Sequence, residues 1–240
     1  MSVNKIFPVN IDDISLGQVV DMILSGNLLG YIVTPNVDHM CRIYKTQSFR
    51  DLYSGANLVV CDSRILQYLS YLSKSPIVNV VRGSDLIVTL LKKIESDEGI
   101  VVVGSDDRFS SQIKDMYGLK NVFCYVPPMG FISNNEEIDR VIDQVGKSKG
   151  RIVLMAVGSP QQEIMSRKLI DIYPDKLFIC CGNAVNFAVG NVSRSPRWMS
   201  DVGLEWLYRC MVEPKRMIPR YLKNVEIFWL YLFSKERSDG

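Results

Sequence analysis

Short apolar runs alternate with amphipathic stretches along most of the chain. Six runs of four to six residues are nearly continuous in apolar side chains and rich in β-branched residues. Such runs predict strands that are covered on both faces, as in a parallel sheet. They are Leu29–Thr34, Leu58–Cys61, Ile100–Gly104, Val122–Val126, Ile152–Val157 and Leu177–Cys181.

The segments between these runs carry apolar residues at helical spacing. They are Val37–Tyr53, Ser84–Glu95, Asp107–Tyr117, Glu136–Val145 and Pro160–Ile172. Strands and helices that alternate with short links predict a doubly wound α/β fold, with a mostly parallel sheet flanked by helices. The alternation stops after Phe187, and from Asp201 we expect two helices separated near Pro214, because proline removes a helix donor. We therefore expect an α/β body over 1–192 and a helical appendage over 193–240.

The composition narrows the class of protein. Apolar residues make up 47% and charged residues 22% of the 240, which is typical of a globular protein and excludes a disordered one. The net charge of only +2 does not point to nucleic acid. The charge is uneven, however, because Ser193–Lys223 holds seven basic residues and three acidic ones. The appendage is therefore basic.

Several kinds of protein and site are not expected. The first residues show no apolar region typical of a signal peptide, and the longest apolar runs, such as Ile227–Phe233, fall far below the about 20 residues that span a bilayer. The six cysteines form no C-x-x-C pair, which favours reduced thiols. His39 is the only histidine, so a multi-histidine zinc site cannot be built, and no D-x-D pair is present to hold a metal-bound nucleotide. We expect no metal.

Polar residues follow several predicted strands, where open α/β sheets bind their ligands. Thr34 and Asn36 offer a hydroxyl and an amide, although Asn36 or Asp38 could instead only cap the next helix. Asp62 follows an apolar strand, so its carboxylate could be partly desolvated and act as a general base. The alternative is that Asp62 caps the helix that follows.

Two glycine-containing strand ends are further candidates for ligand binding. At Gly104 and Ser105 the backbone could approach a phosphate, and the next helix offers free N–H groups. Gly158 precedes Ser159-Pro160, which predicts a serine cap with proline at the first helical position. The Gln162 amide and the Glu163 carboxylate are then expected to be exposed at the mouth of the sheet, where they suit the hydroxyls of a sugar or ribose.

The appendage interleaves aromatic and basic residues. Arg216 and Arg220 are four residues apart and would share one face of a helix. Arginine matches phosphate oxygens, and tryptophan and tyrosine prefer the headgroup level of a membrane. A basic helical tail on an anionic bilayer is one interpretation. The alternative is a solvated face whose aromatic residues pack into the body or into an oligomer contact.

Four motifs in one order make the chain resemble a known family. They are Thr34–His39 (TPNVDH), Gly83–Leu86 (GSDL), Gly158–Glu163 (GSPQQE) and Gly203–Arg209 (GLEWLYR), the last followed by Glu213-Pro214. Together they resemble the WecG/TagA/CpsF glycosyltransferases, over about Thr34 to Tyr221. The resemblance implies a Rossmann-like fold and a bacterial enzyme that moves a hexose from a UDP-sugar to a sugar carried on undecaprenyl diphosphate.

The resemblance also implies details of the reaction and its place. The transferred hexose would be of the N-acetylmannosamine type, its uronic acid or glucose, and the polymer a surface polysaccharide. Transfer would invert the anomeric centre without metal or cofactor. The enzyme would lie peripherally on the cytoplasmic face of the cell membrane, where the appendage closes the site and touches the bilayer. A homo-oligomer, formed through the sheet edge or the tail, is a further possibility.

The resemblance assigns roles to individual residues. Asp62 matches the family's base, Thr34, Asn36 and Gln162 match donor or acceptor contacts, and Arg209, Arg216 and Arg220 match the arginines that meet the acceptor diphosphate. Two positions depart from the family. Ser63 replaces the usual glycine after the base, and the family's arginine before the GSDL motif is Val80 here, so Arg82 is its candidate substitute.

Two other functions compete with a glycosyltransferase. The first is a non-catalytic, membrane-peripheral module that binds a nucleotide-sugar and regulates an assembly complex. The second is a dinucleotide-dependent oxidoreductase, which the absence of the G-x-G-x-x-G fingerprint argues against. Release of UDP from a UDP-sugar in the presence of a lipid-linked acceptor separates the enzyme from the module.

Overall fold

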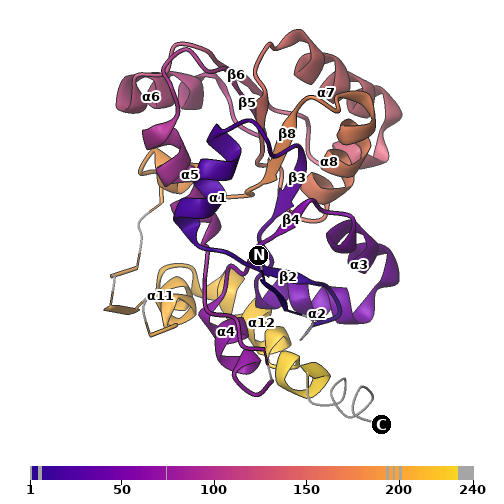
Figure 1. The fold of residues 1–240 in the computed structure, drawn as a ribbon, viewed down its shortest axis with the longest axis vertical. Coiled ribbons are helices and arrows are strands. Elements are labelled where there is room, and N and C mark those ends of the chain that lie inside the picture. The colour runs from indigo at the N-terminus through magenta and orange to yellow at the C-terminus, as the bar shows by residue number, and fades with distance from the viewer. Residues whose placement is uncertain are drawn as a thin grey trace.

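A six-stranded, all-parallel sheet forms the centre of the molecule (Figure 1). The computed structural model describes residues 2–4, 7–73, 75–192, 195–196, 198–199 and 202–231. The strand order is β4-β3-β8-β7-β5-β6. The strands are β3 (Gly30–Val33), β4 (Leu58–Val59), β5 (Ile100–Val103), β6 (Val122–Tyr125), β7 (Ile152–Met155) and β8 (Leu177–Cys180). Each lies within a strand expected from the sequence, and the α/β fold is confirmed.

Helices cover both faces of the sheet, which explains the unbroken apolar runs. Along β3, Tyr31 and Val33 belong to the core on one face and Ile32 to the core on the other, and all three are fully buried. One face carries α1 (Leu16–Leu24), α5 (Gly83–Lys93), α6 (Asp107–Tyr117) and α9 (Ala184–Ala188). The opposite face carries α3 (Gln47–Ser54), α7 (Asn135–Lys147) and α8 (Gln161–Ile172) (Figure 1).

The helix expected over Val37–Tyr53 is two helices, so that expectation is wrong. The first is α2 (Val37–Lys45), and α3 begins at Gln47. Between them Thr46 has an extended backbone, with φ −126° and ψ 113°, which its β-branched side chain favours. The break redirects the chain, so that Phe49 and Tyr53 of α3 are buried in the same core as α8.

The N-terminal residues fasten the edge of the sheet that leads to the candidate site. Strands β1 (Ser2–Asn4) and β2 (Ile11–Asp13) form an antiparallel pair. The Asp12 carboxylate accepts a hydrogen bond from the Val59 N–H at 2.9 Å, and Asp13 accepts from the Val78 and Asn79 N–H groups at 3.0 and 2.8 Å. These bonds satisfy backbone donors of the edge strand β4 and of the loop between α4 (Arg64–Ser70) and α5.

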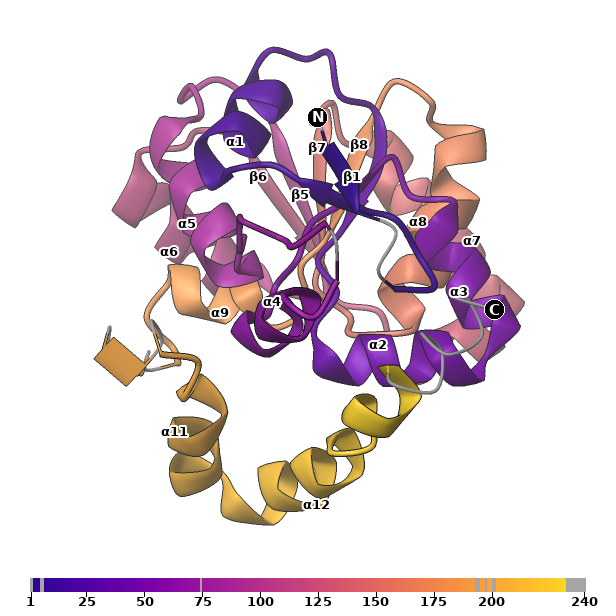
Figure 2. The ribbon, with the colours of Figure 1, turned by 60° about the horizontal axis from the view of Figure 1, so that its bottom comes forward.

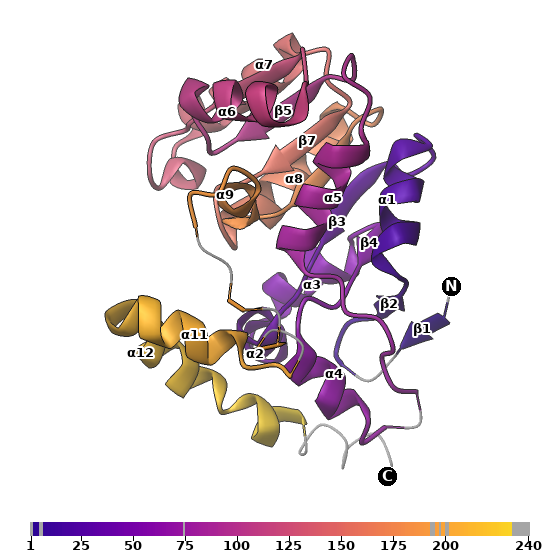
Figure 3. The same cartoon turned by 90° about the vertical axis from the view of Figure 1, so that its left-hand side faces the viewer.

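The two helices that follow α9 in the numbering used here lie beyond the carboxyl ends of the strands, away from the sheet layers (Figures 2 and 3). They are α11 (Glu205–Val212) and α12 (Pro214–Asn224), so the expected separation near Pro214 is confirmed. They pack near α2 and α4 (Arg64–Ser70), and the Lys45–Glu226 ion pair, at 2.5 Å, joins this region to α2. Arg197 and the start of the proposed appendage lie outside the described residues, and the division at 192/193 stays a prediction.

The lengths and hydropathies of the helices bear on any membrane contact. No helix in the described part of the chain is both long enough and apolar enough to cross a bilayer.

Candidate active site

A pocket lies at the carboxyl edge of the sheet, between the α/β body and the helices α11 and α12. Its volume is about 130 Å³. The walls come from the β3–α2 turn, the β4–α4 turn, the start of α5 and the inner faces of α11 and α12. We call it the polar pocket. Among its lining residues are five of the predicted site residues, namely Asn36, Asp62, Arg82, Arg209 and Arg220.

Asp62 is not the cap of α4. Ser63 is the N-cap, and its Oγ accepts a hydrogen bond from the Leu66 N–H at 3.3 Å. The carboxylate of Asp62 instead lies at the N-terminus of α5, where it accepts a backbone hydrogen bond from Gly83. A Cβ built on Gly83 would lie 3.6 Å from Asp62 Oδ2 and 3.3 Å from Thr34 Oγ1. The capping alternative is therefore wrong, and Thr34 and Asp62 converge on the same helix terminus.

The surroundings of Asp62 disfavour its charged form. Burial, with a smaller contribution from the nearby Glu205 carboxylate, raises the pKa of Asp62 from 3.8 to about 8. Arg209, the Gly83 hydrogen bond and Arg82 act in the opposite direction. A carboxylate with so high a pKa takes up a proton near neutral pH much more readily than an exposed aspartate does. The environment of Asp62 therefore suits a general base.

The polar pocket holds more arginines than carboxylates. The arginines are Arg64, Arg82, Arg209 and Arg220, and the carboxylates are Asp38, Asp62 and Glu205. Because the raised pKa of Asp62 leaves it mostly protonated at neutral pH, the excess of positive charge is larger than this count suggests. An anionic ligand, such as a diphosphate, would be attracted to this pocket.

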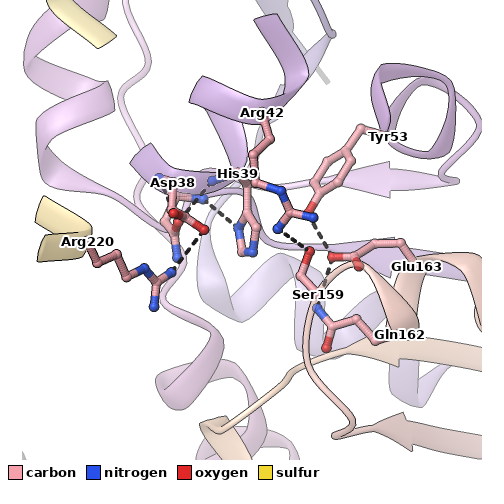
Figure 4. Close-up of polar contacts among 9 residues, drawn as sticks. Asp38, His39, Arg42, Tyr53, Ser159, Gln162, Glu163 and Arg220 are labelled. Atoms are coloured by element: carbon pink, nitrogen blue, oxygen red, sulfur yellow. Dashed lines mark hydrogen bonds and ion pairs between the residues drawn. The ribbon is translucent and has the colours of Figure 1, made fainter. Parts of the chain in front are cut away.

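Carboxylates of the same chain pair with the arginines of the polar pocket. Glu205 lies 2.5 Å from an Arg209 nitrogen of its own helix and 3.8 Å from Arg82 Nε of the body. Arg220 of α12 pairs with Asp38 of α2 at 3.2 Å (Figure 4). These pairs hold guanidinium groups at the pocket, and the pairs of Arg82 and Arg220 connect the C-terminal helices to the α/β body.

The three predicted tail arginines do not lie together. Arg209 and Arg220 line the polar pocket, whereas Arg216 does not. The Arg216 side chain is 65% exposed and pairs with Glu213 at 2.9 Å, one helical turn away. Spacing along α12 placed Arg216 and Arg220 on one face, but only Arg220 reaches the pocket.

Asn36 both caps α2 and lines the polar pocket. Its Oδ1 accepts a hydrogen bond from the Asp38 N–H at 3.1 Å, and the Asn36 N–H donates to His39 Nδ1 at 3.2 Å. Asn36 is therefore the N-cap of α2, but it does not serve only as a cap, because it also lines the polar pocket. Burial lowers the pKa of His39, so the imidazole stays neutral and can accept this bond.

Gln162 and Glu163 are buried, so the expectation that they are exposed at the mouth of the sheet is wrong. Their exposed fractions are 5% and 0%. Tyr53 Oη donates to Glu163 Oε1 at 2.8 Å, and Gln162 Nε2 donates to the same oxygen at 3.0 Å (Figure 4). Gln162 Oε1 accepts from the Gly182 N–H at 2.9 Å. These bonds tie the first turn of α8 to α3 and to the loop after β8.

The start of α8 also differs from the expectation. Pro160, rather than Ser159, is the N-cap, and no side-chain hydrogen bond caps the helix. Ser159 Oγ instead accepts a hydrogen bond from Arg42 of α2 at 3.1 Å (Figure 4). The predicted serine cap is therefore wrong, because Ser159 joins the turn before α8 to α2.

Gly104, Ser105 and Gly158 lie after β5 and β7, outside the lining of the polar pocket. Gly104 has a φ of +109°, and a Cβ on it would lie 2.7 Å from the carbonyl carbon of Ala156. Glycine is required there by the close approach of the two strand ends. The helices that follow the neighbouring strands β5 and β7 pack on opposite faces of the sheet. Ligands of α/β sheets bind between two such strand ends. A phosphate contact at Gly104, Ser105 or Gly158 stays a prediction.

Arg64 and Glu205 are pocket residues that the sequence patterns did not single out. Arg64 lies two residues after Asp62, and Glu205 lies inside the GLEWLYR motif. Arg64 Nε is buried and has no hydrogen-bond partner among the described residues, although its Nη1 donates to Gln67 at 2.8 Å. The sequence feature that could have identified Arg64 as a pocket residue is its position two residues after the candidate base Asp62.

Open α/β sheets bind their ligands beyond the carboxyl ends of the strands, and the polar pocket lies there. The family model described as "Glycosyl transferase WecG/TagA/CpsF family" matches residues 4–239. Because the match covers nearly the whole chain, the protein belongs to this family of glycosyltransferases, and the resemblance drawn from the four motifs is confirmed. In the described part of the chain, no three histidine, cysteine, aspartate or glutamate side chains are placed to hold a metal ion.

Proposed function

We propose that this glycosyltransferase moves a hexose from a UDP-sugar to a sugar carried on undecaprenyl diphosphate, with inversion of the anomeric centre and without metal. The donor hexose is of the N-acetylmannosamine type, its uronic acid or glucose, and the product serves surface polysaccharide synthesis. The observation that carries the proposal is the polar pocket, where the Asp62 carboxyl group faces a set of arginines. The pocket thus combines a base with groups that bind phosphate.

Asp62 takes the proton from the acceptor hydroxyl as that oxygen attacks the anomeric carbon on the face opposite UDP. A positioned base contributes about 10²–10⁴ to the rate. The pKa of about 8 means that the proton-accepting form becomes more abundant as the pH rises toward 8. Turnover should therefore increase with pH over this range.

The arginines of the polar pocket stabilise negative charge. Arg209 and Arg220 bind the acceptor diphosphate, exchanging their ion pairs with Glu205 and Asp38 for phosphate oxygens. Arg82 takes the place of the family arginine that Val80 replaces, since it is the arginine at the start of α5 that lines the pocket. Thr34, beside Asp62, contacts the hydroxyl groups of a substrate.

The C-terminal helices complete the site and bring the enzyme to the cytoplasmic face of the membrane. Helices α11 and α12 contribute Glu205, Trp206, Arg209, Arg220 and Tyr221 to the polar pocket. The body over 1–192 therefore holds Asp62 but lacks the arginines for the acceptor diphosphate. A chain truncated after 192 should lose transfer to lipid-linked acceptors, whereas full activity of the truncated chain would refute the role of these helices.

The test offers the full chain a panel of UDP-sugars together with a short-chain polyprenyl-diphosphate-sugar. Mass spectrometry of the acceptor and an assay for free UDP are the readouts, with D62N as the control. We expect one donor to give an acceptor heavier by one hexose unit, with UDP released in equal amount. Failure of every donor would refute the proposal, and UDP-sugar binding without UDP release would favour a regulatory module.

A further inference from the structure

A second and larger cavity adjoins the polar pocket. It runs between α4 on one side and α11 and α12 on the other, and its volume is about 890 Å³. Its walls are almost wholly apolar, and include Leu72 just after α4, Leu207 of α11 and Leu222 of α12. We call it the apolar groove. Figure 3 shows α4 and the two C-terminal helices on the same side of the molecule.

The walls of the apolar groove expose large side chains to solvent. Leu72 is 56% exposed, Leu222 is 69% exposed and Val225 is 55% exposed. These residues come from two separate segments of the chain that face one another across the groove. Contiguous apolar surface of this kind on a folded domain marks a binding site, because exposure to water is otherwise unfavourable.

The apolar groove and the polar pocket are continuous. Six residues line both cavities, and they are Val37, Ile65, Gly203, Trp206, Tyr221 and Asn224. The rings of Trp206 and Tyr221 meet edge to face, with centroids 6.0 Å apart, at this junction. Gly203 lets the chain pass close to α4, since a Cβ there would lie 3.3 Å from Arg64 Cβ and 3.4 Å from the Tyr68 ring.

The charge of one cavity and the apolar walls of the other define the occupant. A molecule that fills both must have an anionic head next to Arg209 and Arg220 and an apolar chain attached directly to it. A peptide helix or a second copy of the chain would cover the groove without needing its opening into the polar pocket. A polyprenyl diphosphate has the required order of groups.

We propose that the apolar groove binds the first isoprene units of the acceptor's polyprenyl chain, while the diphosphate of the same molecule lies in the polar pocket. This inference rests on the proposed function, since it concerns the acceptor of that reaction. The protein itself then binds the start of the polyprenyl chain, and it selects the lipid of the acceptor before the acceptor sugar reaches Asp62. The remaining isoprene units stay in the membrane.

Two variants on opposite walls test the groove. Leu72→Glu and Leu222→Glu each place a charge in the groove at a side chain that is already exposed, so the fold should tolerate them. Neither residue lines the polar pocket. Met129→Glu, at a fully exposed methionine outside both cavities, is the matched control. Thermal unfolding of all three establishes that they are folded.

Steady-state transfer is measured at low detergent and without vesicles, using acceptors that differ only in the lipid, undecaprenyl or geranyl. The wild-type kcat/KM should be about tenfold or more higher for the undecaprenyl acceptor, because more apolar surface is buried with it. The groove variants should lose most of this advantage. Their kcat/KM for the geranyl acceptor should fall much less, because its two isoprene units fill only part of a groove of about 890 Å³. An equal loss for both acceptors, or no loss for either, would overturn the inference.

A binding measurement separates this inference from the proposed function. Titration calorimetry with undecaprenyl and geranyl diphosphate is carried out with no UDP-sugar present. The wild type and Met129→Glu should bind the longer lipid more tightly than the shorter one, and the two groove variants should not. That result without any transfer would refute the proposed function alone, and equal affinity for both lipids would refute the groove alone.

Two other occupants of the groove would give different results. If the groove variants lose binding to phosphatidylglycerol vesicles that contain no polyprenyl lipid, while their discrimination between the two lipids is intact, the occupant is the bilayer and the inference is overturned. A dimer that forms in sedimentation experiments and is lost in the groove variants would identify a second copy of the chain and would overturn it as well.

Discussion

Replacing Asp62 by asparagine should stabilise the folded protein at alkaline pH. In the unfolded chain this aspartate ionises with a pKa near 3.8, whereas in the folded protein its pKa is about 8. Between these two values the folded state holds a proton that the unfolded state has lost, so the free energy of unfolding falls as the pH rises. An asparagine at this position would carry no charge at any pH, and its side-chain carbonyl could still accept the hydrogen bond from Gly83.

The size of the effect follows from the shift in pKa. The difference between the two pKa values, at about 1.4 kcal/mol for each pH unit, sets a ceiling of about 6 kcal/mol on the cost of the ionised carboxylate. Because the side chain is partly exposed in the polar pocket, water reduces this cost, and we expect about 2–4 kcal/mol. The cost is small below pH 4, grows through the range between the two pKa values and is complete above pH 8.

The assay compares urea unfolding of the wild type and D62N at pH 5 and pH 9. The stability advantage of D62N should be larger at pH 9 than at pH 5, and all groups common to both proteins cancel in the difference. Asp115→Asn, at an exposed aspartate of α6, is the control. The difference in unfolding free energy between this variant and the wild type should be the same at pH 5 and pH 9. An advantage of D62N that is the same at both pH values would show that Asp62 ionises normally and would refute the reasoning.

Three further predictions concern activity. D62N should lower turnover about 10²–10⁴-fold while UDP-sugar affinity, measured by calorimetry, stays near that of the wild type; a variant that keeps most of its rate would show that another group is the base. Glu205→Gln should lower the pKa of Asp62, because the Glu205 carboxylate raises it, and the rising limb of the plot of kcat/KM against pH should move to lower pH. Glu213→Gln, which lies outside the polar pocket, should leave that limb where it is. Arg209→Ala should raise the acceptor KM about tenfold or more, and Arg216→Ala, whose side chain is outside the polar pocket, should change it little; equal effects would contradict the placement of the two arginines.

The order of strands and helices could be predicted from the sequence because burial acts locally on each element. The runs Ile100–Gly104 and Ile152–Val157 are apolar at nearly every position, which only a strand covered on both faces requires. The same rule failed at Thr46, where a break in the helical pattern depended on one extended residue rather than on the periodicity. Periodicity detects the class of an element more reliably than its ends.

The sequence by itself determined the α/β class, the parallel sheet and the family, since all three depend on residue types and their spacing along the chain. Tertiary structure alone decided which polar side chains meet. The motif that contains Glu163 predicts a contact with a sugar, yet the Glu163 carboxylate is buried and accepts a hydrogen bond from Tyr53. Glu205, in contrast, belongs to a helix that is distant in the sequence and lies near Asp62. The direction of a side chain depends on how its element packs on others, and those neighbours are far away in the sequence. The apolar groove has the same origin, because its two walls become one surface only when α4 and the C-terminal helices come together.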